Sequence, residues 1–366
     1  MSLRIVRHAL RSALLVPLGL LAACEIPSDP PILQQTWIIP TDSITVGVSE
    51  ILPANVALNG GGTAFVVTMP SPAALNTTLG ALCGQAACQS GTTVTAPIPA
   101  FTSTAGALGT TVSFPAGVTA ATVASGTVNL SITNNLGFDP LRPNGASAPF
   151  GSVAITLTSG ATTATTTFTG AVRTLANGAT TLFAVPVPTG TYTGTIAVSV
   201  VFAVPAGGSA SLNRANSLSV ATSVQNFTVS QATVVVNADA INTAPTAFDL
   251  EGVDFADQVE SGGLILDVLN PFTAAATMSV AITAPAQNGA GPVTITKALN
   301  IPATPTSSTT ITLAKAELQS LLGKANVTMT VTGTATGTGA DNTVTVTPTQ
   351  RITLRTKVRL VLNVGA

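Results

Sequence analysis

The chain has 366 residues, of which 46% are hydrophobic, 4% aromatic and 7% charged. This length allows two or three domains of ordinary size. The net charge of −1 disfavours a nucleic-acid partner, because binding nucleic acid needs a strongly basic surface. Abundant Ala, Thr, Val, Gly and Ser are typical of short β-strands joined by turns. We therefore expect an all-β protein with no nucleic-acid partner.

The first 23 residues have the pattern of an export signal. Three arginines precede the apolar stretch 13–20, which is too short to span a bilayer. Residues 21–24, Leu-Ala-Ala-Cys, resemble the lipobox of bacterial lipoprotein signals. The resemblance implies cleavage after residue 23 and a lipid on the Cys24 thiol, which makes the membrane a partner through that lipid. A plain signal peptide is the alternative.

Residues 24–36 follow as a tether, because they contain tandem prolines and few apolar side chains. In bacteria with two membranes, lipoproteins like this one go to the outer membrane unless Asp follows the lipidated cysteine. Here Glu25 follows it. The expected location is therefore the cell envelope, with the lipid in the outer membrane.

Residues 37–111 form a β-rich N-terminal region, with strand-like pieces at 43–48 and 63–67 and a helical turn at 72–76. This region is either a small domain of its own or a set of strands that completes the sandwich after it. Cys83 and Cys88 lie here, and an oxidising compartment predicts a disulfide between them. A metal site is disfavoured because two thiols leave a tetrahedral set incomplete.

An internal repeat relates residues 112–240 to residues 246–366. In each copy a Ser-Gly pair leads into an alternating strand that ends in Asn. The sequence separation between Asn134 and Asn270 equals the separation between the two Ser-Gly pairs. The copies also end alike, because 217–237 is similar to 343–363. Apolar alternation with frequent turns predicts two diverged tandem β-sandwich repeats.

The repeat predicts where matched residues lie. Both asparagines should close their strands, where Asn tolerates a left-handed backbone. The linker should fall near residues 242–245, and a fragment starting near Ala244 should fold on its own. Three matched pairs should point inward: Val128 with Leu264, Ile132 with Val268, and Val235 with Val361.

One short helix is predicted in the second repeat, over 313–322, with Thr312 as its cap and Gly323 as its stop. A strand ending in Asn-Pro-Phe at 270–272, followed by strands, this helix and the strand 327–333, resembles the type 2 late-embryogenesis (water stress, WHy) β-sandwich. The resemblance covers residues 263–333 and implies a fold without enzymatic activity.

Charged residues gather in two segments of the second repeat. Acidic side chains are dense between residues 249 and 267, which indicates either a solvated acidic face or a calcium site. The calcium candidates are Asp249, Glu251, Asp254 and Asp257. Near the C-terminus, Arg351, Arg355, Lys357 and Arg359 should share one face of a strand whose other face enters the core. That row is either an ordinary exposed face or a site for an anionic lipid or polymer.

The mature chain offers few groups for catalysis. The single histidine, His8, lies in the signal, which excludes Ser-His-Asp and Cys-His chemistry. We expect no cofactor and no enzymatic activity, but an envelope-anchored protein with a structural or binding role toward an unspecified protein or polymer. A carrier of a lipid or other hydrophobic ligand is the alternative, and a hydrolase would need two acidic residues converging in a cleft.

Overall fold

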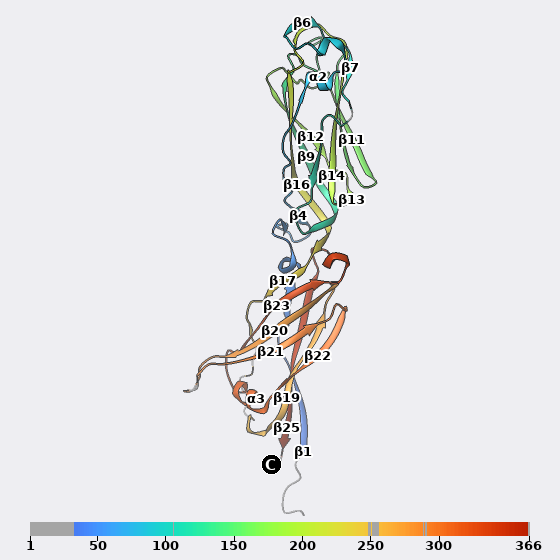
Figure 1. The fold of residues 1–366 in the computed structure, drawn as a ribbon. Helices are drawn as coiled ribbons and strands as arrows, with labels where there is room; N and C mark the ends of the chain where they lie inside the picture. Colours follow the sequence, from blue (N-terminus) through green and yellow to red (C-terminus); the bar gives the residue numbers. More distant parts are fainter. Residues whose placement is uncertain are drawn as a thin grey trace, which may run out of the picture.

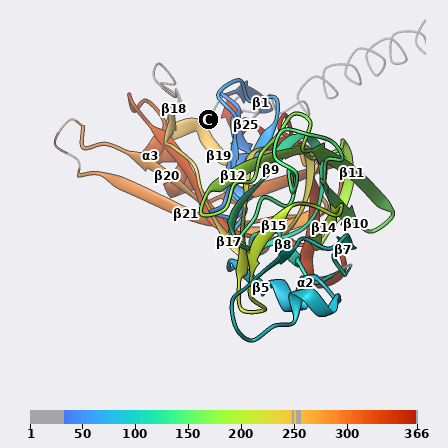
Figure 2. The ribbon, with the colours of Figure 1, turned by 90° about the horizontal axis from the view of Figure 1, so that it is seen from above.

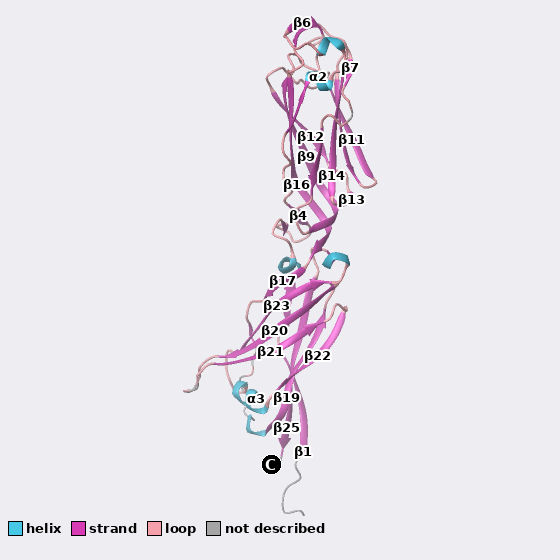
Figure 3. Cartoon of the chain, viewed as in Figure 1, coloured by secondary structure: helices cyan, strands magenta, loops and turns pink. Residues whose placement is uncertain are grey.

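The computed structural model describes residues 33–104, 106–247, 250, 256–287, 289 and 291–364. Its regular structure is almost entirely β-strand (Figure 3). Two β-sandwiches lie end to end in an elongated molecule (Figure 1). The all-β fold with two tandem sandwiches is therefore as the sequence predicts. Within the described residues, no helix is long and apolar enough to cross a membrane.

The first sandwich has two large sheets and a small one at its distal end. The eight-stranded sheet contains β3 (Val56–Leu58), β4 (Phe65–Val67), β5 (Leu75–Thr78), β9 (Val118–Asn135), β12 (Thr180–Pro186), β13 (Gly190–Thr193), β16 (Ser217–Val235) and β24 (Thr343–Val346). The facing sheet contains β7 (Phe101–Thr102), β8 (Gly109–Ser113), β10 (Ser152–Ser159), β11 (Thr162–Thr169) and β14 (Thr195–Val204). The small sheet pairs β6 (Val94–Pro97) with β15 (Ser209–Leu212).

The second sandwich has two five-stranded sheets. One contains β1 (Leu33–Pro40), β2 (Ile44–Gly47), β19 (Val259–Leu269), β22 (Thr306–Leu313) and β25 (Arg351–Val364). The other contains β17 (Asn237–Asn242), β18 (Thr246–Ala247), β20 (Ala274–Ala284), β21 (Val293–Ile301) and β23 (Thr328–Gly337). Figure 2 shows β20 and β21 reaching out to one side of the molecule. We call the sheet that contains β25 the terminal sheet, because both ends of the described chain lie in it.

Six strands in each sandwich follow the same pairing scheme. In the first copy β9 pairs with β12 and β16, and β10 pairs with β11 and β14. In the second copy β19 pairs with β22 and β25, and β20 pairs with β21 and β23. The two copies are thus one fold made twice.

A buried asparagine forms the same hydrogen bonds in each copy. The Asn134 amide donates to the carbonyls of Phe138 (2.8 Å) and Leu175 (2.7 Å), and its oxygen accepts from the Leu136 N–H (2.9 Å). The Asn270 amide donates to the carbonyl four residues on (2.9 Å) and to that of Pro302 (3.0 Å), and its oxygen accepts from the N–H two residues on (3.1 Å). Neither asparagine has a positive φ, so the expected left-handed backbone is wrong, and side-chain bonds close these strands instead.

The alignment of the two copies at their ends is corrected by the strand register. Leu130 on β9 pairs with Thr222, and its counterpart Leu266 on β19 pairs with Thr356. Thr222 therefore corresponds to Thr356, and β16 to β25. The segment 343–346, which the sequence matched to the start of β16, is instead the short strand β24 that pairs with the end of β16.

The core follows the predicted alternation in the first half of each copy. Val128, Leu264, Ile132 and Val268 are buried, as predicted. Val235 and Val361 are only half-buried, so their prediction is wrong. The strand pleat explains this result, because their neighbours Val234, Val236, Leu360 and Leu362 are the residues that face inward.

Strands before residue 112 complete both sandwiches. β1 and β2 pair with β25 of the second sandwich. β4 and β5 pair with β16, and β7 and β8 pair with β14, all in the first sandwich. The sequence left open a separate domain or completion of the first sandwich, and did not anticipate pairing with the second. The expected helical turn at 72–76 is also wrong, because β5 occupies Leu75–Thr78 and helix α2 (Leu79–Leu82) follows it.

The chain passes between the sandwiches at Val236 rather than at the expected linker near 242–245. β17 starts directly after it and pairs with β23, so residues 237–242 already belong to the second sandwich. Val236 is buried, and its N–H donates to the Asn342 carbonyl (3.0 Å). The 3₁₀ helix η1 (Val48–Ile51), also at this junction, packs against β17.

The predicted helix of the second repeat is α3, over Lys315–Leu321. It begins two residues later than expected, because Thr312 belongs to strand β22 and does not cap the helix. The Glu317 carboxylate instead accepts a hydrogen bond from the Ala314 N–H (2.7 Å). Gly323, the expected stop, has a φ of 71° and follows the end of the helix.

Candidate functional site

Strand β25 carries a row of basic side chains on the outer face of the terminal sheet. Exposed or half-buried Arg351, Arg355, Lys357 and Arg359 alternate with buried Ile352, Leu354, Val358 and Leu360. This is the division that the sequence predicts. The row places four positive side chains on one face of the second sandwich.

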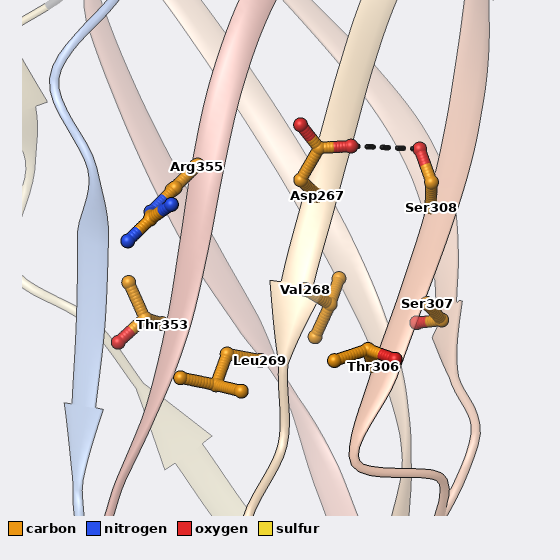
Figure 4. A pocket seen from close by; sticks show the side chains of 8 residues that line it. All are labelled: Asp267, Val268, Leu269, Thr306, Ser307, Ser308, Thr353 and Arg355. Carbon is orange, nitrogen blue, oxygen red and sulfur yellow. Dashed lines mark hydrogen bonds between the residues drawn. The ribbon is translucent and has the colours of Figure 1, made fainter.

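A hollow of about 540 Å³ lies beside this row, where β19 ends and β22 begins (Figure 4). Three neighbouring strands build it, because Asp267 on β19 pairs with both Arg355 on β25 and Ser308 on β22. Its lining residues are Asp267, Val268, Leu269, Thr306, Ser307, Ser308, Thr353 and Arg355. The hollow therefore combines a cation, a carboxylate, hydroxyl groups and the exposed side chain of Leu269.

Asp267 is held by donors from both neighbouring strands. Its Oδ2 accepts from Lys357 Nζ (2.7 Å), and its Oδ1 accepts from Ser308 Oγ (2.8 Å). The hydrogen bond from Lys357, then that from Ser308, lowers the pKa of the Asp267 carboxyl below its ordinary value. The carboxylate therefore stays ionised and fixed in place. The ion pair joins the acidic segment to the basic row.

One group of the hollow keeps capacity for a ligand. It is not Ser307, whose buried Oγ has no hydrogen-bond partner among the described residues, because Ser307 pairs with the core-facing Val268. The Arg355 guanidinium is exposed, and within the described part of the chain it forms no hydrogen bond or ion pair. A guanidinium beside hydroxyl groups suits a ligand with oxygen acceptors. Among the described residues that line the hollow, Asp267 is the only acidic one.

The acidic segment is spread out where the structure describes it. Asp249, Glu251 and Asp254 lie outside the described residues. Asp257 is exposed in the 3₁₀ helix η3 (Ala256–Gln258), and Glu260 forms an ion pair with Lys315 (3.6 Å). Among the described residues, no three Asp, Glu, Cys or His side chains gather as a metal site. The calcium site stays a prediction.

The cysteines of the N-terminal region form the predicted disulfide. Cys83 and Cys88 are bonded, with their Cα atoms 6.0 Å apart, and both are buried. The Gln89 amide bridges this loop by donating to the carbonyls of Gly80 (2.8 Å) and Cys83 (2.9 Å). Cys24, the expected lipidation site, lies outside the described residues.

Sequence reasoning identified the two charges of the hollow but not the site itself. It placed Asp267 in an acidic segment and Arg355 in a basic row. It missed Ser307 and Ser308, although the Ser/Thr-rich segment 306–312 indicated an exposed strand face. The missing information was the strand register, which sets these residues side by side.

No family model and no curated protein matches this chain. Solved structures give distant matches. A protein from Parabacteroides distasonis ATCC 8503 that is described as secreted is 11% identical, covering 89% of this chain and 99% of its own, with a TM-score of 0.31. The STIV MCP is also 11% identical, covering 78% of this chain and 97% of its own, with a TM-score of 0.15. These scores are too low to support an argument, and the resemblance to the WHy sandwich stays a prediction.

Proposed function

We propose that this chain is an envelope-anchored lipoprotein whose two sandwiches have a structural or binding role and catalyse no reaction. The position of β1 in the terminal sheet is the observation that supports this proposal. β1 follows Cys24 by nine residues and pairs with β25 along its whole length, from Leu33 with Val364 to Pro40 with Lys357. A lipid on Cys24 would thus hold the folded body by a continuous β-ladder, with the first sandwich projecting away from the anchored end (Figure 1).

Two observations support a role without catalysis or ligand transport. The described residues that line the hollow of the terminal sheet include one carboxylate, whereas glycoside hydrolysis uses two. Large side chains fill the interior of the first sandwich, including fully buried Phe65, Phe183, Phe202, Phe227 and Tyr192. Such packing favours a structural or binding body over a carrier. The basic row and the hollow are where we expect an envelope ligand with oxygen acceptors to bind.

The test of anchoring is replacement of Cys24. In a bacterium with two membranes, the wild-type chain should take up labelled fatty acid and fractionate with the outer membrane, as Glu25 predicts. Cys24→Ser should lose the label and leave the membrane fraction. Cys83→Ser with Cys88→Ser is the matched control and should keep both. Equal retention of wild type and Cys24→Ser in the membrane would contradict the proposal.

A further inference from the structure

The first described strand exposes large apolar side chains at the end of the molecule that the anchor reaches. Leu33, Trp37 and Ile38 are 58%, 45% and 56% exposed. Leu33 pairs with Val364, so β1 begins at the end of the second sandwich farthest from the first (Figure 1). Exposure to water does not explain three large apolar side chains in one edge strand. Clusters of exposed apolar side chains are typical of interaction surfaces.

Both faces of β1 contribute to this surface. Ile38 pairs with Arg359 on the outer face of the terminal sheet, whereas Trp37 pairs with the buried Leu360 on the inner face. The apolar side chains therefore surround the edge of the sheet, with a positive charge beside them. Tryptophan is enriched at the boundary between lipid headgroups and acyl chains, where its ring is partly apolar and its N–H remains in contact with water.

The length of the preceding chain brings this edge to the membrane. Nine residues from Cys24 to Leu33 span at most about 30 Å. Resting on the lipid anchoring proposed above, we propose that Leu33, Trp37 and Ile38 contact the headgroup–acyl boundary of the membrane that holds the anchor. β1 is then a second membrane contact, which fixes how the elongated body stands on the bilayer.

The test uses Trp37 as the probe, because it is the single tryptophan of the chain. The purified lipidated protein is reconstituted into vesicles of phosphatidylethanolamine and phosphatidylglycerol, with or without brominated acyl chains. Flotation with the vesicles reports anchoring, and loss of Trp37 emission in brominated vesicles reports contact. We expect flotation in both cases and loss of emission only with bromine.

Two variants make the result specific. Trp37→Phe with Leu182→Trp moves the probe to an exposed position on β12 of the first sandwich, where emission should not change with bromine. Leu33→Glu with Ile38→Glu should float but lose less emission than wild type, because its apolar contact is removed. Both sites are exposed, so the fold is kept.

The outcomes separate this inference from the proposed function. Flotation with unchanged Trp37 emission overturns the membrane contact and leaves the anchor in place. Absence of flotation overturns the anchor itself. If unchanged emission accompanies a concentration-dependent dimer that Leu33→Glu with Ile38→Glu abolishes, β1 pairs with a second copy and the membrane contact is wrong.

Discussion

Asn134 and Asn270 show how one buried side chain can organise a repeat. Each amide satisfies two backbone carbonyls and one backbone N–H that the end of a strand leaves without ladder partners. The second carbonyl belongs to the loop before β12 or β22, so the asparagine joins the end of one strand to the start of its neighbour. Buried backbone groups need such partners because water cannot reach them.

We expect Asn134→Ala and Asn270→Ala to destabilise their sandwiches by similar amounts, about 2–4 kcal/mol each, because three backbone groups lose their partners. Urea unfolding of the two variants measures this. Asn144→Ala is the control, since its exposed amide makes a single bond to the Ala206 carbonyl, and should cost less than about 1 kcal/mol. A large effect of only one of the two substitutions would show that Asn134 and Asn270 do not have equivalent roles.

The matched threonines Thr222 and Thr356 differ in their hydrogen bonds. Both are buried, but the Thr222 hydroxyl has no hydrogen-bond partner among the described residues, whereas the Thr356 hydroxyl donates to the Asp42 carbonyl (2.9 Å). Thr222→Val should therefore leave stability unchanged or raise it. Thr356→Val should lower it by about 1 kcal/mol, because the Asp42 carbonyl loses its donor. Thermal unfolding of both isosteric variants checks this, and effects of the same sign would contradict it.

At the scale of elements, α3 depends on Glu317. The carboxylate accepts from the Ala314 N–H at the helix start and forms an ion pair with Lys297 of β21 (2.8 Å). The bond from Lys297, then that from Ala314, lowers the pKa of Glu317 below its ordinary value. A lowered carboxyl pKa means that the stabilisation is present above the unfolded-state pKa and disappears as the pH falls through the folded-state pKa.

Glu317→Ala should accordingly lower the free energy of unfolding by about 1 kcal/mol at neutral pH, through the lost cap and ion pair. The difference from wild type should vanish once the pH is below the lowered pKa. Glu260→Ala is the control, because its ion pair with Lys315 is longer, at 3.6 Å, and half exposed. Unfolding of the three proteins across pH measures this, and a difference that persists in acid would assign the effect to packing.

Elements were predictable where one local pattern determines them. Alternation gave strands such as β10 and β23, and the residues around Asn134 and Asn270 gave the first half of the repeat. The Thr312 cap failed because the alternation of β22 continues through Leu313, and a strand takes precedence over a local cap. The predicted alignment of the C-terminal parts of the two copies was wrong, because the resemblance of 343–346 to the start of β16 is only local. The strands that correspond in the two copies are identified by their pairing with β9 and β19. For the same reason, the hollow could not be assembled from sequence.

The strands of the two sandwiches are interleaved along the sequence, so the sandwiches are not two consecutive domains. The described part of the chain starts in the second sandwich with β1 and β2 and then forms most of the first sandwich. It returns to the second at Val236, contributes β24 to the first and finishes with β25. The first described strand therefore pairs with the last, which no local pattern indicates because β1 is exposed or half-buried throughout. Because β1 and β25 are far apart in the sequence, they can pair only when the chain between them is complete.

This topology changes what an isolated second repeat should do. A fragment starting near Ala244 lacks β1, β2 and β17, so it exposes β25 and β23 as unpaired edges. It also leaves the sites of Ile44 and Val46 empty, two side chains that are each 2% exposed in the full chain. Burying a side chain of this size contributes about 1.5–3 kcal/mol. We therefore expect this fragment to fold poorly, contrary to the expectation from the repeat alone.

A permuted fragment should recover the fold. Because Leu33 pairs with Val364, a two-residue Asn-Gly turn can join residues 237–364 to residues 33–47 as a β-hairpin. This fragment should unfold cooperatively in urea, and residues 237–364 alone should be less stable by several kcal/mol or unfolded. The same permuted fragment with Ile44→Ser and Val46→Ser keeps the hairpin but loses the buried side chains, and should lie between the two. Equal stability of all three would mean that the strands near the anchor only lie against the second sandwich and do not complete it.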